Sequence, residues 1–360
     1  MKLLIFSLVC AVSLLGFLLS HMLETQLVKK RVSSMQLNLR KRVLQSRDMQ
    51  AGLRDRDPYW KRADGPERIK MCGRDEAFAR TRFAVVSLLT VDAQHMYTES
   101  AMKLATSLRW WLPQQQMDLV MLLTEGFGVD GQVVEGVAFD RMTLDRAGWN
   151  VLCRVPKIVH PTVSDGNRFH EAALYSKLNA WGLTEYDAIL YLDSDTLVVR
   201  SPLSLFTFHL PAMLLRGSTL GACRDRPAKY SESFNGGVLL IIPGKGPAGE
   251  DLSPAILQHS IGTVPHVVGF AEQGLLNAMW GQHGFYELPY VFNANLVSKY
   301  EEPALWLRNV DRLVIVHYTV AKGWQSLRFF QLNDMFTVWW CYKWSIDDYC
   351  RLWESVSIKP

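Results

Sequence analysis

Two aspartates lie close together at the end of an apolar stretch near the middle of the chain. Residues 188–199 read AILYLDSDTLVV, so one serine separates Asp193 from Asp195. In an extended strand, residues two apart point to the same side, which predicts that both carboxylates face one spot at the carboxyl end of the strand. Such carboxylates repel each other and are penalised by burial, unless a cation compensates or one acid carries a proton. A hard divalent cation with oxygen ligands is the simplest answer, although a strand that ends in an Asp-capped turn has the same pattern.

The segments around this pair alternate between strand-like and helix-like patterns. Apolar runs at 83–90, 118–124 and 151–155 predict strands, and the segments 97–111 and 170–183 predict helices. Alternation of this kind is typical of a mainly parallel sheet covered by helices. Because such sheets bind ligands at the carboxyl ends of their strands, the two aspartates are placed at a functional edge.

A glycine-rich motif follows the second predicted strand. Residues 126–131 read GFGVDG and match the G-x-G-x-x-G pattern of dinucleotide-binding proteins. The next residues, QVVEGVAFDRM, alternate like a strand and contain Gly136, so no helix N-terminus follows to receive a pyrophosphate. We therefore interpret the glycines as turn residues.

The N-terminal residues differ in composition from the rest of the chain. Residues 3–20 carry no charge, which predicts a transmembrane signal anchor over 1–21, and a poor cleavage site favours the anchor over a cleaved signal peptide. Under the positive-inside rule, the basic residues 29–31 would keep the rest of the chain in the cytosol. Long domains, however, translocate largely regardless of charge. Residues 22–82 hold 16 Lys and Arg against 8 Asp and Glu. Residues 22–81 are therefore predicted to form a basic stem near anionic lipid, not a nucleic-acid-binding face.

The stem and the cysteines leave two questions open. Apolar residues at helical spacing in residues 22–50 fit either a self-associating stalk, which would make the chain a homodimer, or a frayed amphipathic helix. Six cysteines include Cys10 in the anchor, and the remaining five form no C-x-x-C pair, which argues against a thiolate zinc site and leaves disulfides unassigned. The body, residues 82–328, is predicted to be one domain, and residues 329–360 an aromatic-rich helical extension.

Six blocks of sequence appear in a fixed order through the body. They read VVSLLTVDAQHMY (85–97), YSKLNAWGLTEYDAILYLDSDTLVV (175–199), FNGGVLLI (234–241), EQGLLN (272–277), LPYVFN (288–293) and VIVHYTVAKGW (314–324). In this order they resemble the family 8 glycosyltransferases, which include glycogenin and plant glycogenin-like glucuronosyltransferases. The resemblance implies an α/β fold of the GT-A type, with a mainly parallel central sheet that binds a nucleotide sugar.

The resemblance also implies a metal site. Asp193 and Asp195 match the family's metal-binding acids and His317 matches the third protein ligand, so Mn²⁺ would bridge the enzyme to the donor diphosphate. Lys322 resembles a lysine that contacts this diphosphate. The motif around it, HYTVAKGW, is one residue shorter than the family pattern and has Gly323 in place of proline.

Other positions match residues that bind the donor. With the two metal-binding acids, Lys177, Gln273 and Asp225 are the candidate catalytic residues. The family usually has aspartate where this chain has Glu272. The positions that match donor contacts are Leu88, Thr90, Val91 and Tyr97 for uracil and ribose, Lys177, Asn235 and Gln273 for the sugar or its phosphates, and Gly236 and Gly237 for close backbone approach.

The implied activity is retaining transfer of a hexose or hexuronic acid from a UDP-sugar to a carbohydrate or lipid-linked acceptor. The predicted setting is the Golgi membrane, with the catalytic domain in the lumen and a single-pass type II anchor. Arg224 and Arg226 would suit a glucuronate carboxylate. The alternatives are a catalytically silent UDP-sugar-binding protein, a Mg²⁺ phosphatase, for which the nucleophile motif is missing, and a self-glucosylating primer, because Tyr300 falls near the family's acceptor tyrosine.

Overall fold

The computed structural model of the chain describes residues 82–90, 95–112, 117–124, 133–134, 137–138, 144, 148–161, 172–227, 230, 232–281 and 283–319. The predicted anchor, stem and C-terminal extension lie outside the described residues, and so do Val91 and Lys322. Within the described ranges, no helix is both long enough and apolar enough to cross a bilayer.

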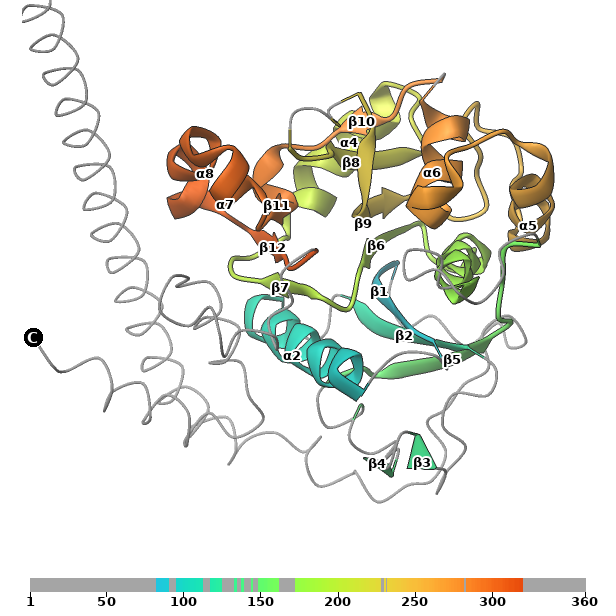
Figure 1. Cartoon of the computed structure of the whole chain (residues 1–360), viewed down its shortest axis with the longest axis horizontal. Coiled ribbons are helices and arrows are strands. Elements are labelled where there is room, and N and C mark those ends of the chain that lie inside the picture. The colour runs from blue at the N-terminus through green and yellow to red at the C-terminus, as the bar shows by residue number, and fades with distance from the viewer. Residues whose placement is uncertain are drawn as a thin grey trace, which may run out of the picture. The chain divides into compact units, whose positions relative to one another are not determined.

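A seven-stranded sheet forms the centre of the larger of two compact units (Figure 1). Its strands, in spatial order, are β10 (Tyr286–Glu287), β8 (Leu220–Arg224), β9 (Phe234–Ile241), β6 (Ala188–Leu192), β1 (Phe83–Leu89), β2 (Asp118–Thr124) and β5 (Val151–Val155). The strands β6, β1, β2 and β5 run parallel, whereas β9 runs antiparallel to both β6 and β8. The predicted α/β fold with a mainly parallel sheet is therefore confirmed.

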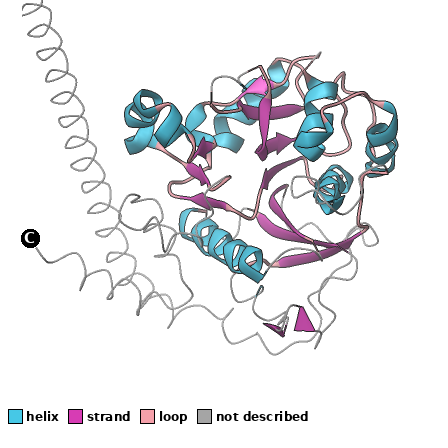
Figure 2. Cartoon of the chain, in the orientation of Figure 1, coloured by secondary structure: helices cyan, strands magenta, loops and turns pink. Residues whose placement is uncertain are grey.

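Helices cover both faces of this sheet (Figures 1 and 2). One face packs against α2 (His95–Trp111), η3 (Leu205–His209) and α4 (Leu210–Leu215), and the other against η2 (Ala172–Gly182), α5 (Pro254–Thr263) and α6 (Ala271–Trp280). In the central strand β1, Val85 and Leu89 face the first layer while Ala84 and Val86 face the second. Because both faces are buried, the strands are continuous apolar runs without polar alternation.

A three-stranded sheet brings the C-terminal part of the larger unit to the end of β6. Its order is β11 (Ala294–Asn295), β12 (Ile315–His317) and β7 (Thr196–Val198), and β12 is antiparallel to β7. The turn η6 (Tyr290–Phe292) and helix α7 (Ser298–Glu301) flank β11 in the sequence. The described residues of the smaller unit are Ala304–Arg312, which comprise most of α8 (Pro303–Asn309) and the turn η7 (Val310–Arg312).

Two sequence interpretations gain detail here. The residues after the GFGVDG motif include two short antiparallel strands, β3 (Val133–Val134) and β4 (Val137–Ala138), which agrees with a strand rather than a phosphate-binding helix. Cys153 in β5 is disulfide-bonded, while Cys223 in β8 is free and buried. The partner of Cys153 is not among the described cysteines.

Candidate functional site

The two aspartates lie in a tight turn and not within one strand, which corrects the sequence-based geometry. The strand β6 ends at Leu192 and β7 begins at Thr196. The Thr196 backbone N–H and hydroxyl both donate to the Asp193 carbonyl, at 3.0 and 2.7 Å, and close the turn. From α2, the Ser100 hydroxyl donates to the Ser194 carbonyl at 2.7 Å. The predicted position at the carboxyl end of β6 is confirmed, but the turn sets the side-chain directions.

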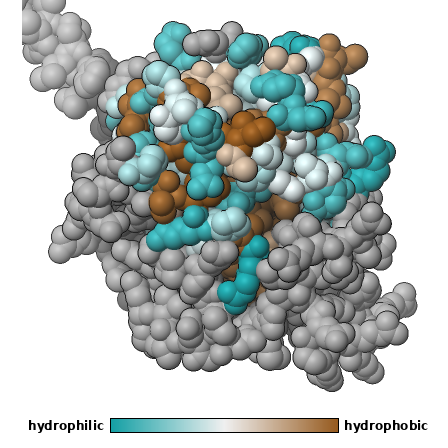
Figure 3. Space-filling model, turned by 90° about the vertical axis from the view of Figure 1, so that its right-hand side faces the viewer, coloured by the Kyte–Doolittle hydropathy of each residue, from teal (hydrophilic) through white to brown (hydrophobic). Residues whose placement is uncertain are grey.

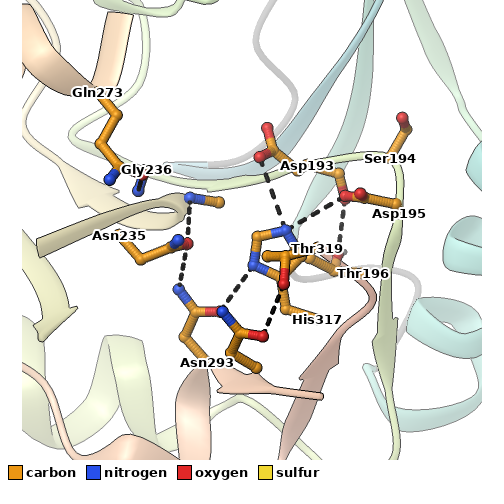
Figure 4. Close-up of polar contacts among 12 residues, drawn as sticks. Asp193, Ser194, Asp195, Thr196, Asn235, Gly236, Gln273, Asn293, His317 and Thr319 are labelled. Atoms are coloured by element: carbon orange, nitrogen blue, oxygen red, sulfur yellow. Dashed lines mark hydrogen bonds and ion pairs between the residues drawn. The ribbon is translucent and has the colours of Figure 1, made fainter. Parts of the chain in front are cut away.

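His317 reaches the same spot from the end of β12. The antiparallel pairing of β12 with β7 sets His317 opposite Thr196, and the Tyr318 N–H donates to the Asp195 carbonyl at 3.0 Å. The His317 Nε2 atom lies 3.3 Å from Asp195 Oδ1 and 3.9 Å from Asp193 Oδ2 (Figure 4). One ligand atom from each of the three side chains falls within 4.8 Å of the others. The structure thus brings together the three residues predicted as metal ligands.

The hydrogen bond on the far side of the ring suits His317 for metal binding. Its Nδ1 lies 3.0 Å from Asn293 Oδ1, which accepts a proton but cannot donate one. We assign the Asn293 amide from its other contact, in which Nδ2 donates to Asn235 Oδ1 at 2.9 Å. With Nδ1 protonated, the neutral ring turns the lone pair of Nε2 toward the carboxylates. Two carboxylates and one imidazole form a donor set that fits a divalent cation such as Mn²⁺.

Gly237 makes room for the imidazole. A Cβ atom at this position would lie 2.0 Å from His317 Cε1 and 2.6 Å from its Nδ1. The Gly237 carbonyl also accepts from the Asp193 N–H at 2.8 Å, so the backbone of β9 touches both the turn and the ring. Gly237 thus allows close approach of the His317 ring, while the expected approach of the donor to Gly236 and Gly237 stays a prediction.

Lys177 is buried among acidic groups. Its Nζ lies 2.9 Å from Asp193 Oδ1, contacts Glu272 Oε1, and donates to the Gly236 carbonyl at 3.1 Å. Only 3% of the residue is exposed, which excludes the interpretation of Lys177 as a helix-surface lysine. Lys177 therefore joins the turn after β6 to the start of α6.

Burial and charge act in opposite directions on this lysine and its partner. Burial lowers the pKa of Lys177, but Asp193 and Glu272 outweigh that effect and the net pKa is raised, so the group is an ammonium. Burial raises the pKa of Glu272, and Lys177 partly offsets the rise. The buried Tyr191 phenol, whose pKa burial and the nearby acids raise well above its usual value, stays protonated and hydrogen bonds to Asp193. Asp195 adds a further carboxylate beside Asp193 and His317, and paired carboxylates of this kind suit a divalent cation.

A chain of hydrogen bonds runs from the candidate metal site to a second polar cluster, and Figure 4 shows its first links, from His317 through Asn293 to Asn235. Beyond Asn293, the Asn235 Nδ2 donates to Asp225 Oδ1 at 3.1 Å. The other Asp225 oxygen accepts from Gln273 Nε2 at 2.9 Å, and Gln273 Oε1 accepts from the Gly236 N–H at 2.9 Å. Asp225, Asn235 and Gln273, all predicted site residues, thus meet in one network linked to His317.

The described residues predicted to contact the nucleoside lie at the end of β1 and on α2. Leu88 and Thr90 are buried at the end of β1, and Tyr97 is half-buried on α2, where it packs against the core. Their contact with uracil and ribose stays a prediction. Arg224 pairs with Glu287 and Arg226 pairs with Glu302, each at 3.0 Å. Both guanidinium groups therefore already have a carboxylate partner, which weakens the case for their binding a glucuronate carboxylate.

Two functional residues escaped the sequence analysis. Asn293 closes the LPYVFN block, and nothing in its spacing indicates a bond to a histidine 24 residues away. Tyr191 lies in an apolar strand, but it precedes Asp193 by two residues, a spacing that indicates the same side of an extended segment.

We expect replacement of Asn293 by alanine to weaken metal binding. The variant removes the acceptor that holds the His317 ring, and loss of such outer contacts typically lowers metal affinity by roughly 10- to 100-fold. The measurement is a Mn²⁺ titration of the melting temperature. Asn309→Ala is the matched control, because its amide bonds the Leu305 carbonyl within α8. Equal half-saturating Mn²⁺ concentrations for wild type and Asn293→Ala would contradict this role.

Replacement of Lys177 by methionine should leave buried carboxylates without their cation. Breaking a buried ion pair in this way typically lowers the free energy of unfolding by about 3–5 kcal/mol. A Glu272 carboxyl whose pKa is raised above 4.5 favours folding when protonated, so the variant should lose more stability as the pH rises above that value. Urea unfolding of Lys177→Met at acidic and neutral pH tests both expectations. Addition of Glu272→Gln should restore part of the loss, and a double variant no more stable than Lys177→Met would refute the pairing.

The sequence matches one family of known proteins. Residues 132–328, more than half of the chain, match the family model Glycosyl transferase family 8. Glycogenin-1 of Caenorhabditis elegans is 26% identical over 46% of this chain and 35% of its own length. UDP-glucuronate:xylan alpha-glucuronosyltransferase 1 of Arabidopsis thaliana is 24% identical over 68% of this chain and 33% of its own length. The solved glycosyltransferase GlyE of Streptococcus pneumoniae is 19% identical, with a TM-score of 0.48 over 77% of this chain and 65% of its own.

The chain thus spans about a third of the length of the curated relatives that it matches. The match includes the acidic turn, the Gly236–Gly237 strand, Gln273 and His317, all of which the geometry joins in one site. The chain belongs to glycosyl transferase family 8.

Proposed function

We propose that this chain transfers a hexose or hexuronic acid, with retention, from a UDP-sugar to a carbohydrate or lipid-linked acceptor, with Mn²⁺ held by Asp193, Asp195 and His317. The observation that carries the proposal is the metal-ligand triad, whose imidazole is fixed by Asn293. A bound Mn²⁺ would supply the positive charge that stabilises the departing diphosphate. The relatives named for UDP-glucuronate transfer support a UDP-sugar donor.

The protein's own residues supply the positioning. Lys177 holds the Asp193 carboxylate and the Gly236 carbonyl in fixed relation, and Asn293 holds the His317 ring. Gln273 and Asp225 lie at the other end of the network, where their polar groups would bind sugar hydroxyls. Because these side chains already hold their positions in the structure without a ligand, binding of the donor would not have to order them.

The expected activity is Mn²⁺-dependent release of UDP from at least one of UDP-glucose, UDP-galactose and UDP-glucuronate. Asp195→Asn should lower the rate of UDP release roughly 100-fold. The variant loses one of the three proposed metal ligands, and the negative charge of its carboxylate. Asp251→Asn, at an exposed acid whose carboxylate lies 2.7 Å from Lys245 Nζ, is the matched control. Specific binding of UDP-sugar without release from any donor would instead favour a catalytically silent binding protein.

A self-glucosylating primer is the second candidate, and one observation favours it. Tyr300 lies on α7 with 54% of its surface exposed, so the side chain is accessible to a second copy of the enzyme. Intact mass before and after incubation with UDP-glucose and Mn²⁺ distinguishes the two. A gain of hexose units that Tyr300→Phe abolishes supports the primer, and an unchanged mass excludes it.

We propose the Golgi membrane as the location, with a lumenal catalytic domain behind a single-pass type II anchor. The uncharged run at residues 3–20 supports the anchor, and the disulfide at Cys153 supports an oxidising compartment. The test is protease protection of the full-length protein in sealed microsomes. Digestion of the body without detergent would overturn the lumenal orientation.

A further inference from the structure

Two exposed aromatic side chains lie beside the polar end of the site. Tyr230 and Phe270 are 40% and 44% exposed, and their ring centroids are 6.0 Å apart with an interplanar angle of 75°. An edge-to-face pair of this kind covers at most one of the four ring faces. The pair therefore presents apolar ring surface to the solvent.

The segments that carry these rings also meet inside the site. Tyr230 lies in the loop after β8, five residues beyond Asp225, and Phe270 lies in η5 (Val268–Phe270), three residues before Gln273. The Asp225–Gln273 hydrogen bond, at 2.9 Å, joins the same two segments at their buried end. The two segments thus extend from the polar cluster at one end to the aromatic pair at the other.

Backbone contacts fix both segments. The loop after β8 is closed by bonds from the Asp225 N–H to the Ser233 carbonyl at 2.9 Å and from the Ser233 N–H to the Tyr230 carbonyl at 3.0 Å. In the other segment, a Cβ atom on Gly274 would lie 2.2 Å from the Val267 carbonyl oxygen, so the turn before α6 packs directly on the helix. Ala271, between Phe270 and Glu272, has a φ of +48°, a strained value for a residue with a side chain. Rings on segments held by such contacts lose less conformational freedom when a ligand binds.

We propose that Tyr230 and Phe270 form an acceptor platform on which a saccharide ring stacks, with its hydroxyl edge toward Asp225 and Gln273. The inference rests on the proposed function, because the platform adjoins the cluster that would hold the donor sugar. A pyranose has apolar C–H faces and a polar rim, and this surface combines exposed rings with carboxylate and amide groups a few residues away in the sequence. The stacking surface and the polar groups would therefore contact different parts of one sugar.

The surrounding surface favours a saccharide over a lipid chain. A hydrocarbon chain needs a continuous apolar field of several hundred Å². On the face that carries α5, hydrophobic and hydrophilic residues are interspersed (Figure 3). Beside the platform, the buried Tyr175 hydroxyl lies 3.0 Å from His266 Nε2, and His266 precedes the exposed Val267 by one residue. The half-buried His266 thus places one polar ring next to the exposed Val267.

The test uses maltotriose, cellotriose and xylotriose as probes, with direct binding measured by saturation-transfer NMR on the full chain. We expect at least one trisaccharide to bind saturably, and Phe270→Ala and Tyr230→Ala each to weaken it roughly tenfold, as for loss of one aromatic contact. Phe270→Tyr should retain most of the affinity. Phe208→Ala, at an aromatic residue on η3 that is 66% exposed, is the matched control and should bind like wild type.

A kinetic measurement separates this proposal from the proposed function. With an accepted trisaccharide, Phe270→Ala should lower the ratio of transfer to UDP-sugar hydrolysis roughly tenfold. Absence of hydrolysis in the wild type would refute the proposed function while trisaccharide binding still tests the platform. Equal binding by wild type and both alanine variants, or no binding of any trisaccharide, would overturn the platform. Loss of binding to phosphatidylcholine vesicles in the same variants, without loss of trisaccharide binding, would assign the surface to lipid and also overturn it.

Discussion

The structure around the site depends on the burial of several acids beside one lysine. Asp193 and Glu272 contact the ammonium of Lys177, and Asp195 lies in the same turn as Asp193. Carboxylates at such short range are unfavourable without compensation, and the Lys177 ammonium compensates Asp193 and Glu272. Asp193 and Asp195 also lie beside His317. The same electrostatic constraint therefore holds the turn after β6 against α6 and places these side chains where they would suit a divalent cation.

The hydrogen-bond chain from His317 to Gln273 makes the two halves of the site one unit. Asn293 and Asn235 are buried amides, and each uses its oxygen toward one neighbour and its nitrogen toward the next. A buried amide that loses either neighbour leaves an unsatisfied group, which costs about 1–3 kcal/mol. Movement of the imidazole would thus disturb Asp225, and movement of Asp225 would disturb the imidazole. This arrangement keeps the metal ligands and the groups near the proposed sugar pocket at a constant separation.

Most of the sheet and the position of the two aspartates could be predicted from the sequence, for local physical reasons. The apolar runs in β1, β2 and β6 are long because both faces of the sheet are covered, and the two aspartates end the run abruptly. The position of His317 came from the resemblance of the last block, because the pairing of β12 with β7 joins residues about 120 positions apart. The residues that hold the ligands were harder to predict. Asn293 acts through an amide direction, which local spacing does not indicate. Lys177 was expected at the site from the resemblance, but its burial between Asp193 and Glu272 depends on the packing of three separate segments.

The arginine pairs show how packing changes the meaning of a pattern. Arg224 and Arg226 flank Asp225 and, in the sequence, resemble a site for an anionic sugar. In the fold their side chains meet Glu287 and Glu302, and only the aspartate between them turns into the site. In an extended segment, alternate residues point to opposite sides, so the two arginines share a side that Asp225 does not. The segment after β8 therefore directs the Asp225 carboxylate into the site, and Arg224 and Arg226 hold the segment to its neighbours.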